Sequence, residues 1–265
     1  MTAQLIHRKQ VKQEARQLLR EATVSPVVMV SSILLMQMGL NFAGSLTSNM
    51  ENPILSTFLY ILTMLMGLVL SAGFILYCMT IRRKEHAEYT TLFDGFSIVG
   101  KVISLYFLQS FYVFLWSMVF LVPGLIAFYR YRFAIYNLLE NPELSIFQAL
   151  ELSKRQTLGY KNQCFLLDLS YIGWLILGSL PTYLVNLSYN ITVFYSEPIP
   201  FLVTISQIPT PVAVLACGLW NLVVAYFYYA NMACADLEYY EIAKSTSGIT
   251  PFTDLFQRSN SHNMF

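Results

Sequence analysis

Charged residues are scarce in this sequence. They make up 12% of its 265 residues, whereas a soluble domain usually carries roughly 25%. Hydrophobic residues make up 56%, and the mean hydropathy is +0.53. This balance excludes an ordinary soluble domain and favours a chain that crosses a membrane several times. The formal net charge of +1 indicates neither a nucleic-acid binder nor a protein that selects acidic substrates.

Catalytic and metal-binding motifs are absent from the sequence. It contains no HExxH, GxSxG or Walker sequence. Its histidines, His7, His86 and His262, lie in polar segments, and the "KEHAEY" turn around His86 is typical of a solvated loop. The four cysteines lie within or beside apolar runs without metal-ligand spacing, as small packing residues do. We therefore expect no metal and no cofactor, and the missing motifs favour a non-enzymatic protein.

Six apolar segments form a predicted membrane domain over residues 24–235, between a polar arm, 1–23, and a polar tail, 236–265. They cover about residues 24–46, 54–81, 98–122, 124–139, 165–187 and 209–235. A helix needs roughly 20 apolar residues to cross a hydrocarbon core of about 30 Å, and all segments except 124–139 reach that length. The arm is too polar for a signal peptide. The predicted fold class is all-α, a polytopic helical membrane bundle of about six transmembrane segments.

Lysine and arginine are unevenly distributed between these segments. They occur in the arm, at 82–84, around 154–161 and in the tail, whereas 47–53 and 188–208 contain neither. Because basic residues gather on the cytoplasmic side, the pattern predicts a plasma-membrane protein of a bacterium with both termini cytoplasmic. The chain must then cross an even number of times between Lys101 and Lys154. Segment 124–139 is thus predicted to return to the cytoplasmic side after a type II turn at Pro123 and Gly124, either as a full span or as a re-entrant segment.

Two amphipathic stretches lie outside the apolar segments. In the arm, one helical face opposite the basic residues is apolar: Leu5, Val11, Ala15, Leu18, Leu19 and Ala22. Two interpretations stand for it, an interfacial helix in contact with anionic lipid and a solvated helix that only sets the orientation. Residues 145–158 are predicted to form a cytoplasmic helix, because Ser145 and Gln148 make a capping box and Gly159 ends the stretch.

Three charges fall inside the apolar segments: Arg130, Arg132 and Asp168. Charges in a membrane usually face an interior and find partners. Arg132 and Asp168 lie at similar depths from the predicted cytoplasmic ends, which predicts an ion pair between them. Arg130 cannot face the same partner, because two residues turn a helix by about 200°. The pair either fixes the register of the helices or contacts a substrate or lipid headgroup, and nearby tyrosines offer hydroxyl or cation–π partners.

Several phrases resemble a known family. They are "LFDGF" (92–96), "VPGLIAFYRYRFAIYNLLENPELS" (122–145), "ALELSKRQTLGYK" (149–161) and "FLLDLSYIGW" (165–174). The chain resembles the uncharacterised bacterial multi-pass membrane proteins grouped as domain of unknown function 975, which are distantly similar to the membrane domain of some glycerophosphodiester phosphodiesterases. The resemblance implies a helical membrane fold with no established activity. The phosphodiesterase chemistry is not implied, because it belongs to a separate soluble domain.

The sequence thus leads to two functional expectations. The first is a non-enzymatic accessory, scaffold or transporter-like component of a bacterial plasma membrane. The second is a membrane-embedded binder or enzyme that acts on lipid headgroups. A transporter predicts a polar cavity that reaches the membrane midplane, and a lipid binder predicts a lateral opening near the basic rim. A pure scaffold predicts no cavity at all, with Asp168 fully paired. The expected partners are the bilayer, anionic lipid at the arm and an unknown membrane protein, with no nucleic acid.

Overall fold

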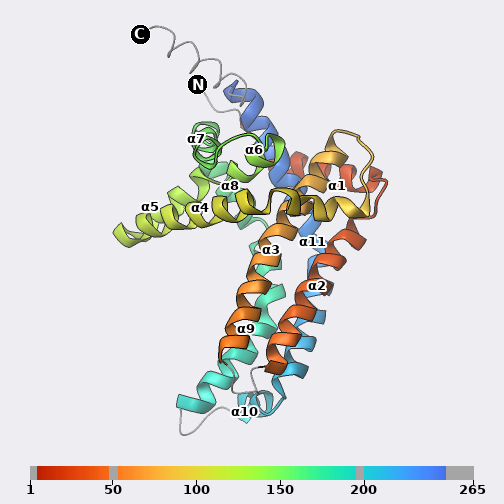
Figure 1. Ribbon diagram of the computed structural model, residues 1–265, viewed down its shortest axis with the longest axis vertical. Helices are drawn as coiled ribbons and strands as arrows, with labels where there is room; N and C mark the ends of the chain where they lie inside the picture. Colours follow the sequence, from red (N-terminus) through yellow and green to blue (C-terminus); the bar gives the residue numbers. More distant parts are fainter. Residues whose placement is uncertain (1–4, 48–52, 195–199, 249–265) are drawn as a thin grey trace. The chain divides into compact units, whose positions relative to one another are not determined.

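The described part of the chain, residues 5–47, 53–194 and 200–248 of a computed structural model, is helical and contains no strand (Figure 1). The elements are α1 (Arg8–Glu21), α2 (Pro26–Thr47), α3 (Pro53–Arg82), the 3-10 helix η2 (Tyr89–Ile98), α4 (Val99–Val119), α5 (Leu121–Arg130), α6 (Ala134–Glu140), α7 (Ile146–Gln156), α8 (Lys161–Leu169), α9 (Ile172–Phe194), α10 (Pro200–Ser206) and α11 (Thr210–Ser247). The all-α class is therefore confirmed.

Several of these helices are long and apolar enough to cross a membrane. Within the described residues they number four: Pro26–Leu46, Ile54–Arg82, Tyr89–Val119 and Thr210–Ser247. A fifth is obtained if Lys161–Leu169 and Ile172–Asn190, which meet at a bend of 53°, count as one broken span. Five of the six predicted segments thus correspond to such helices. The remaining one, 124–139, does not, because its backbone leaves the helical conformation between α5 and α6.

The chain divides into two compact units. Unit 1 contains residues 1–24, 68–169 and 231–265, and unit 2 contains residues 25–67 and 170–230. Unit 2 is built from α2, the first half of α3, α9, α10 and the first half of α11. Aromatic side chains pack between its helices: Trp174 of α9 stacks on Phe227 of α11, with 5.9 Å between the ring centroids. The indole Nε1 of Trp220 donates to the Leu177 carbonyl at 2.8 Å, which ties α11 to α9.

Unit 1 has a well-filled core around α6. All of Ala134–Leu139 is buried, together with Phe74 and Tyr77 from α3 and Tyr239 and Tyr240 from α11. Tyr136 stacks on Tyr240 with ring centroids 5.1 Å apart. Such interdigitated aromatic packing holds α6 inside protein.

Helix α1 belongs to this unit and is packed against it. Val11 and Ala15 are buried. The Asn231 side-chain amide donates to the Lys12 carbonyl at 3.2 Å, and the backbone N–H of Ile6 donates to Gln163 Oε1 at 2.8 Å. Part of the apolar face predicted for lipid or solvent is therefore covered by protein. Contact of α1 with anionic lipid stays a prediction, and residues 1–4 lie outside the described residues.

Helices α4 and α5 lie side by side as an antiparallel hairpin (Figure 1). The break falls at Phe120, whose backbone is extended with φ −161° and ψ 156°. The turn predicted at Pro123 and Gly124 is thus corrected: both residues lie in the first turn of α5, where proline is tolerated because its missing N–H has no intrahelical partner there. Gly124 is required by a close approach, since a Cβ there would lie 2.9 Å from the Ser117 Cα.

Two other boundaries bear on the site. Ser145 caps α7, with its hydroxyl accepting from the Gln148 N–H at 3.3 Å and the Gln148 Oε1 accepting from the Ser145 N–H at 2.9 Å. Gly159 has the positive φ of 86° that ends such a helix. Helix α11 continues to Ser247, beyond the predicted segment end at 235, because its buried face continues through Leu237 and Ala243. Tail residues 249–265 lie outside the described residues.

Candidate functional site

One guanidinium and two carboxylates form the centre of unit 1. Arg132 Nη1 lies 2.5 Å from Asp168 Oδ2, and Arg132 Nη2 lies 2.7 Å from Asp168 Oδ1. Arg132 Nε donates to Asp236 Oδ1 at 2.6 Å. The Arg132 side chain is only 10% exposed. The structure thus brings Arg132 and Asp168 together in the bidentate geometry that makes arginine–carboxylate bonds strong, and it adds Asp236 as a second anion.

Three separate segments position this cluster. Arg132 lies in the short non-helical stretch between α5 and α6, Asp168 lies one residue from the end of α8, and Asp236 lies on α11. The backbone at Tyr131 and Phe133 has ψ near 0°, at 4° and 1°, so the chain bends on both sides of Arg132. This bend directs one side chain toward two helices. The cluster therefore joins the α5–α6 stretch, α8 and α11 within unit 1.

Two tyrosines complete the hydrogen bonding of the carboxylates. The Tyr129 hydroxyl donates to Asp168 Oδ2 at 2.9 Å, and the Tyr136 hydroxyl donates to Asp236 Oδ2 at 2.8 Å. The Tyr129 ring also lies 5.6 Å from the Arg132 guanidinium carbon. One cation faces two anions here, so the cluster carries one negative charge in excess when all three ionise. The phenol donors compensate for the second cation that the cluster lacks.

Arg130 is in a different environment. Its guanidinium carbon lies 6.0 Å from the centroid of the Trp116 ring on α4, and its carbonyl accepts hydrogen bonds from the hydroxyls of Ser153 and Thr157. No carboxylate of the described residues forms an ion pair with it. The two arginines of "RYR" therefore have separate surroundings, because the helix ends at Arg130 and the chain bends at Arg132.

Asp236 is the member of the cluster that sequence reasoning missed. It falls directly after the last apolar segment, where an acidic residue has the appearance of the start of a polar tail. The one available signal was the apolar spacing that continues beyond it, because Leu237, Tyr239, Tyr240 and Ala243 are all buried. That spacing extends the helix and makes Asp236 an internal position.

A second polar network lies around Glu140 at the end of α6. Its Oε1 lies 2.5 Å from Lys244 Nζ, and its Oε2 accepts from the Tyr240 hydroxyl at 2.7 Å. Burial disfavours the ionised carboxylate, but these two hydrogen bonds outweigh it, so the pKa of Glu140 lies below its ordinary value. Three residues before Glu140, Asn137 exchanges two amide hydrogen bonds with Gln156, at 2.8 and 3.0 Å. These bonds connect α6 to α7.

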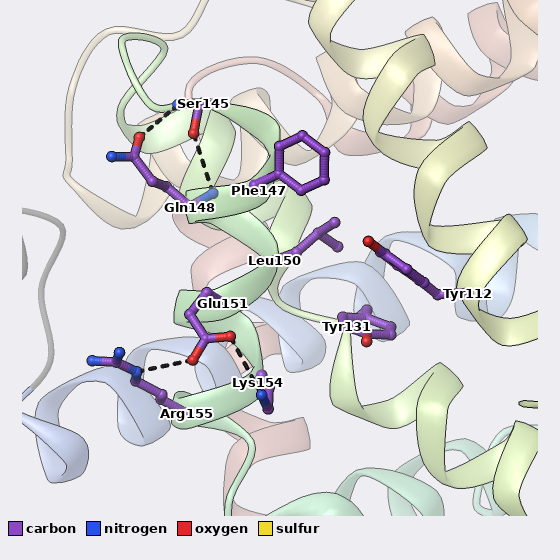
Figure 2. Close-up of a pocket in the computed structure, with 9 residues that line it drawn as sticks. All are labelled: Tyr112, Tyr131, Ser145, Phe147, Gln148, Leu150, Glu151, Lys154 and Arg155. Atoms are coloured by element: carbon purple, nitrogen blue, oxygen red, sulfur yellow. Dashed lines mark hydrogen bonds and ion pairs between the residues drawn. The ribbon is translucent and has the colours of Figure 1, made fainter.

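A pocket of about 410 Å³ lies between α7 and the tyrosines of α4 and the α5–α6 stretch (Figure 2). Tyr112 and Tyr131 stack at 5.7 Å and form one wall. Figure 2 shows Phe147 and Leu150 of α7 directed toward them. The polar rim is supplied by Glu151, Lys154 and Arg155, with both cations within 3.4 Å of the carboxylate. An aromatic wall, an apolar floor and a basic rim together suit an amphiphile.

Other candidate groups offer little chemistry. The described residues contain no group of three or more His, Cys, Asp or Glu side chains placed to hold a metal ion. His86 Nδ1 lies 3.2 Å from the carbonyl of the adjacent Ala87. Cys78 and Cys234 are buried with their sulfurs 3.3 Å apart. The best-defined arrangement in the unit is thus a set of paired charges.

Comparison with known proteins agrees with the resemblance seen in the sequence. A family model described as "Protein of unknown function (DUF975)" matches residues 1–137 and 119–241. No curated protein and no solved structure matches the chain. The distant similarity to the membrane domain of glycerophosphodiester phosphodiesterases is therefore not shown.

Proposed function

Since the chain belongs to the DUF975 family of proteins of unknown function, we propose that it is a multi-pass, non-enzymatic scaffold or accessory component of a bacterial plasma membrane. Four or five of its described helices have the length and hydropathy for spanning. The absence of lysine and arginine from 47–53 and 188–208 supports an orientation with both termini in the cytoplasm.

The pairing of Arg132 with Asp168 and Asp236 carries this proposal. A transport site or an acid–base catalyst needs a group that is free to change its partner or its proton. Here each carboxylate has an arginine contact between 2.5 and 2.7 Å and a tyrosine donor. Such a satisfied cluster fixes the relative position of three segments. Its role is therefore to hold unit 1 in one conformation for presentation to a partner.

Thiol labelling at Cys164 separates a scaffold from a transporter. Cys164 is buried on α8, four residues before Asp168, and so lies one turn from the cluster. A transport pathway through the cluster would hydrate this thiol in at least one state. We expect a membrane-impermeant thiol reagent to leave Cys164 unlabelled from either side of sealed vesicles in a variant that keeps it as the single cysteine. Labelling after denaturation confirms that the thiol is reactive, and Asn162→Cys at an exposed position provides the matched control.

A second candidate function, recognition of lipid headgroups, is favoured by the pocket in Figure 2. An anionic lipid would place acyl carbon against Tyr131 and Phe147 and its phosphate near Lys154. Native mass spectrometry of delipidated protein with phosphatidylglycerol tests this directly. We expect Lys154→Gln and Phe147→Ala to reduce retained lipid. Lys84→Gln serves as the control, because Lys84 is exposed and does not line the pocket. Equal retention by all variants would contradict lipid recognition at this pocket.

A further inference from the structure

We propose that the α4–α5 hairpin enters one leaflet of the bilayer from the cytoplasmic side and returns to the same side without crossing. The inference rests on the proposed membrane location, and it adds a surface of stated chemistry, the acyl chains of a single leaflet. It also replaces two predicted crossings, by segments 98–122 and 124–139, although Tyr89–Val119 is among the helices long enough to span. The shorter path keeps the distribution of basic residues.

The pairing of residues along the hairpin shows which part of it extends away from the unit 1 core. Gly124 approaches Ser117, and Tyr131 stacks on Tyr112. The arms therefore run antiparallel from Phe120 back to the Tyr112–Tyr131 pair. Helix α4 packs on α6 and α7 of the unit 1 core, and its buried residues, Val102 and Leu105, lie before that pair. The exposed part of the hairpin is therefore its tip around Phe120. Toward the end of α5, Ala127 and Tyr129 are buried, and Tyr129 donates to Asp168 of α8.

The hairpin is no longer than one leaflet is thick. Helix α5 has 10 residues, which at about 1.5 Å per residue extend about 15 Å. The hydrocarbon core is about 30 Å thick, so even the full length of α5 reaches no farther than the midplane. A second crossing would need the chain to continue through α6. That helix is buried in unit 1 and separated from α5 by the bend around Arg132.

The composition of the tip excludes an aqueous loop. From Met118 to Phe128 the sequence "MVFLVPGLIAF" contains no polar side chain, and residues 102–129 contain no charge. Met118, Phe120, Leu121 and Val122 are 64 to 83% exposed within the chain. The stretch 47–53, "TSNMENP", shows the polar character expected of a loop that emerges into water. Exposed apolar side chains around an entire tip fit acyl chains, which surround it on every side.

The base of the hairpin carries the groups that favour an interface. Arg130 lies at the end of α5, with its guanidinium carbon 6.0 Å from the Trp116 ring centroid. Tyr112 and Tyr131 stack at the same level. Tyrosine and tryptophan are enriched where hydrocarbon meets headgroups, and arginine extends its charge to that level. This placement also explains why Arg130 does not need a carboxylate among the described residues.

Site-directed thiol labelling tests the path. In a Cys217→Ala background, since the other native cysteines are buried, single cysteines replace Leu121 at the tip, Ile54 at the start of α3 and Tyr89 beyond its end. We expect an impermeant maleimide to label Ile54→Cys from one side of sealed vesicles and Tyr89→Cys from the other. Leu121→Cys should be labelled from neither side. The two controls test the multi-pass proposal by themselves, so its failure is distinguishable from failure of the hairpin.

The alternatives give different results. Labelling of Leu121→Cys from the side of Ile54→Cys would show two complete crossings. Labelling from the side of Tyr89→Cys would show a hairpin in water. A protein partner could also protect Leu121→Cys from labelling. To distinguish this from burial among acyl chains, bimane is attached to Leu121→Cys and the protein is reconstituted with brominated phosphatidylcholine. We expect the strongest quenching when the bromines lie near the acyl-chain ends, and absence of quenching would overturn the proposal.

Discussion

Replacing Arg132 by methionine should destabilise unit 1 strongly. The substitution keeps a long apolar side chain but removes the guanidinium that contacts both Asp168 and Asp236. Two carboxylates then face each other without a cation. Breaking a buried ion pair by removing one partner costs about 3–5 kcal/mol. The carboxylate side chains are 23% and 15% exposed, so they retain some water, and we expect a loss near the lower limit, about 3 kcal/mol.

Two further variants show whether the charge balance is the cause. The triple variant Arg132→Met, Asp168→Asn and Asp236→Asn removes all three charges, while its amide oxygens still accept from Tyr129 and Tyr136. We expect it to recover most of the lost stability, because the penalty arises from unpaired charge. Arg130→Met is the matched control two residues away. It loses only a cation–π contact, worth about 0.5–1 kcal/mol.

Thermal denaturation in a mild detergent, followed by circular dichroism, measures these effects. A loss of about 3 kcal/mol lowers the midpoint on the order of 10 °C for a chain of this size. The reasoning is refuted if Arg132→Met has the midpoint of the wild type, or if the triple variant is no more stable than Arg132→Met alone. Equal losses in Arg130→Met and Arg132→Met would also refute it, since the structure pairs only Arg132.

Three further perturbations test other parts of unit 1. Gly124→Ala inserts a Cβ into the α4–α5 contact and should cost about 1–3 kcal/mol of stability. At the control position Gly100 an added Cβ would meet no heavy atom within 4 Å, so Gly100→Ala should leave the thermal midpoint unchanged. Equal midpoints for the two variants would contradict the close approach at Gly124. Mild oxidation should form a disulfide between Cys78 and Cys234, whose sulfurs lie 3.3 Å apart, and mass spectrometry should then detect two fewer free thiols. If both thiols persist, the result argues against this contact between α3 and α11. The pKa of Glu140 is lower in the folded chain, so the stability that this carboxylate contributes is complete above the unfolded pKa near 4.5 and disappears as pH falls through the folded pKa. Glu140→Gln should therefore lower the thermal midpoint at neutral pH and make the midpoint fall less steeply in acid. An unchanged dependence of the midpoint on pH would contradict this role.

The fold class and most apolar helices could be predicted from composition and run length. A span is a local property, because about 20 consecutive apolar residues decide it. The cap at Ser145 is equally local, since both partners lie within one helical turn. The helix break at Phe120 could not be predicted in this way. Pro123 disfavours a continuous helix through this point, but the turn lies three residues before it, where the hairpin brings Ser117 against Gly124.

The candidate site shows the same division. The expectation that charges in apolar segments find partners singled out Arg132 and Asp168. The depth and spacing arguments assumed a straight helix, whereas the structure places Arg132 in a bend between α5 and α6. Their position relative to a membrane and any functional role stay predictions. Asp236 lies 104 residues from Arg132 along the chain, and no local pattern relates the two.

The sequence by itself determined that this chain is helical, apolar and asymmetric in its basic residues, because these properties follow from residue type and order alone. Tertiary structure decided which charges meet and where α4 turns into α5. It also decided that segment 124–139 is divided between an exposed hairpin arm and a buried helix. These outcomes depend on the packing of α6, α8 and α11 around Arg132, and packing is set by distances between segments that sequence order does not contain.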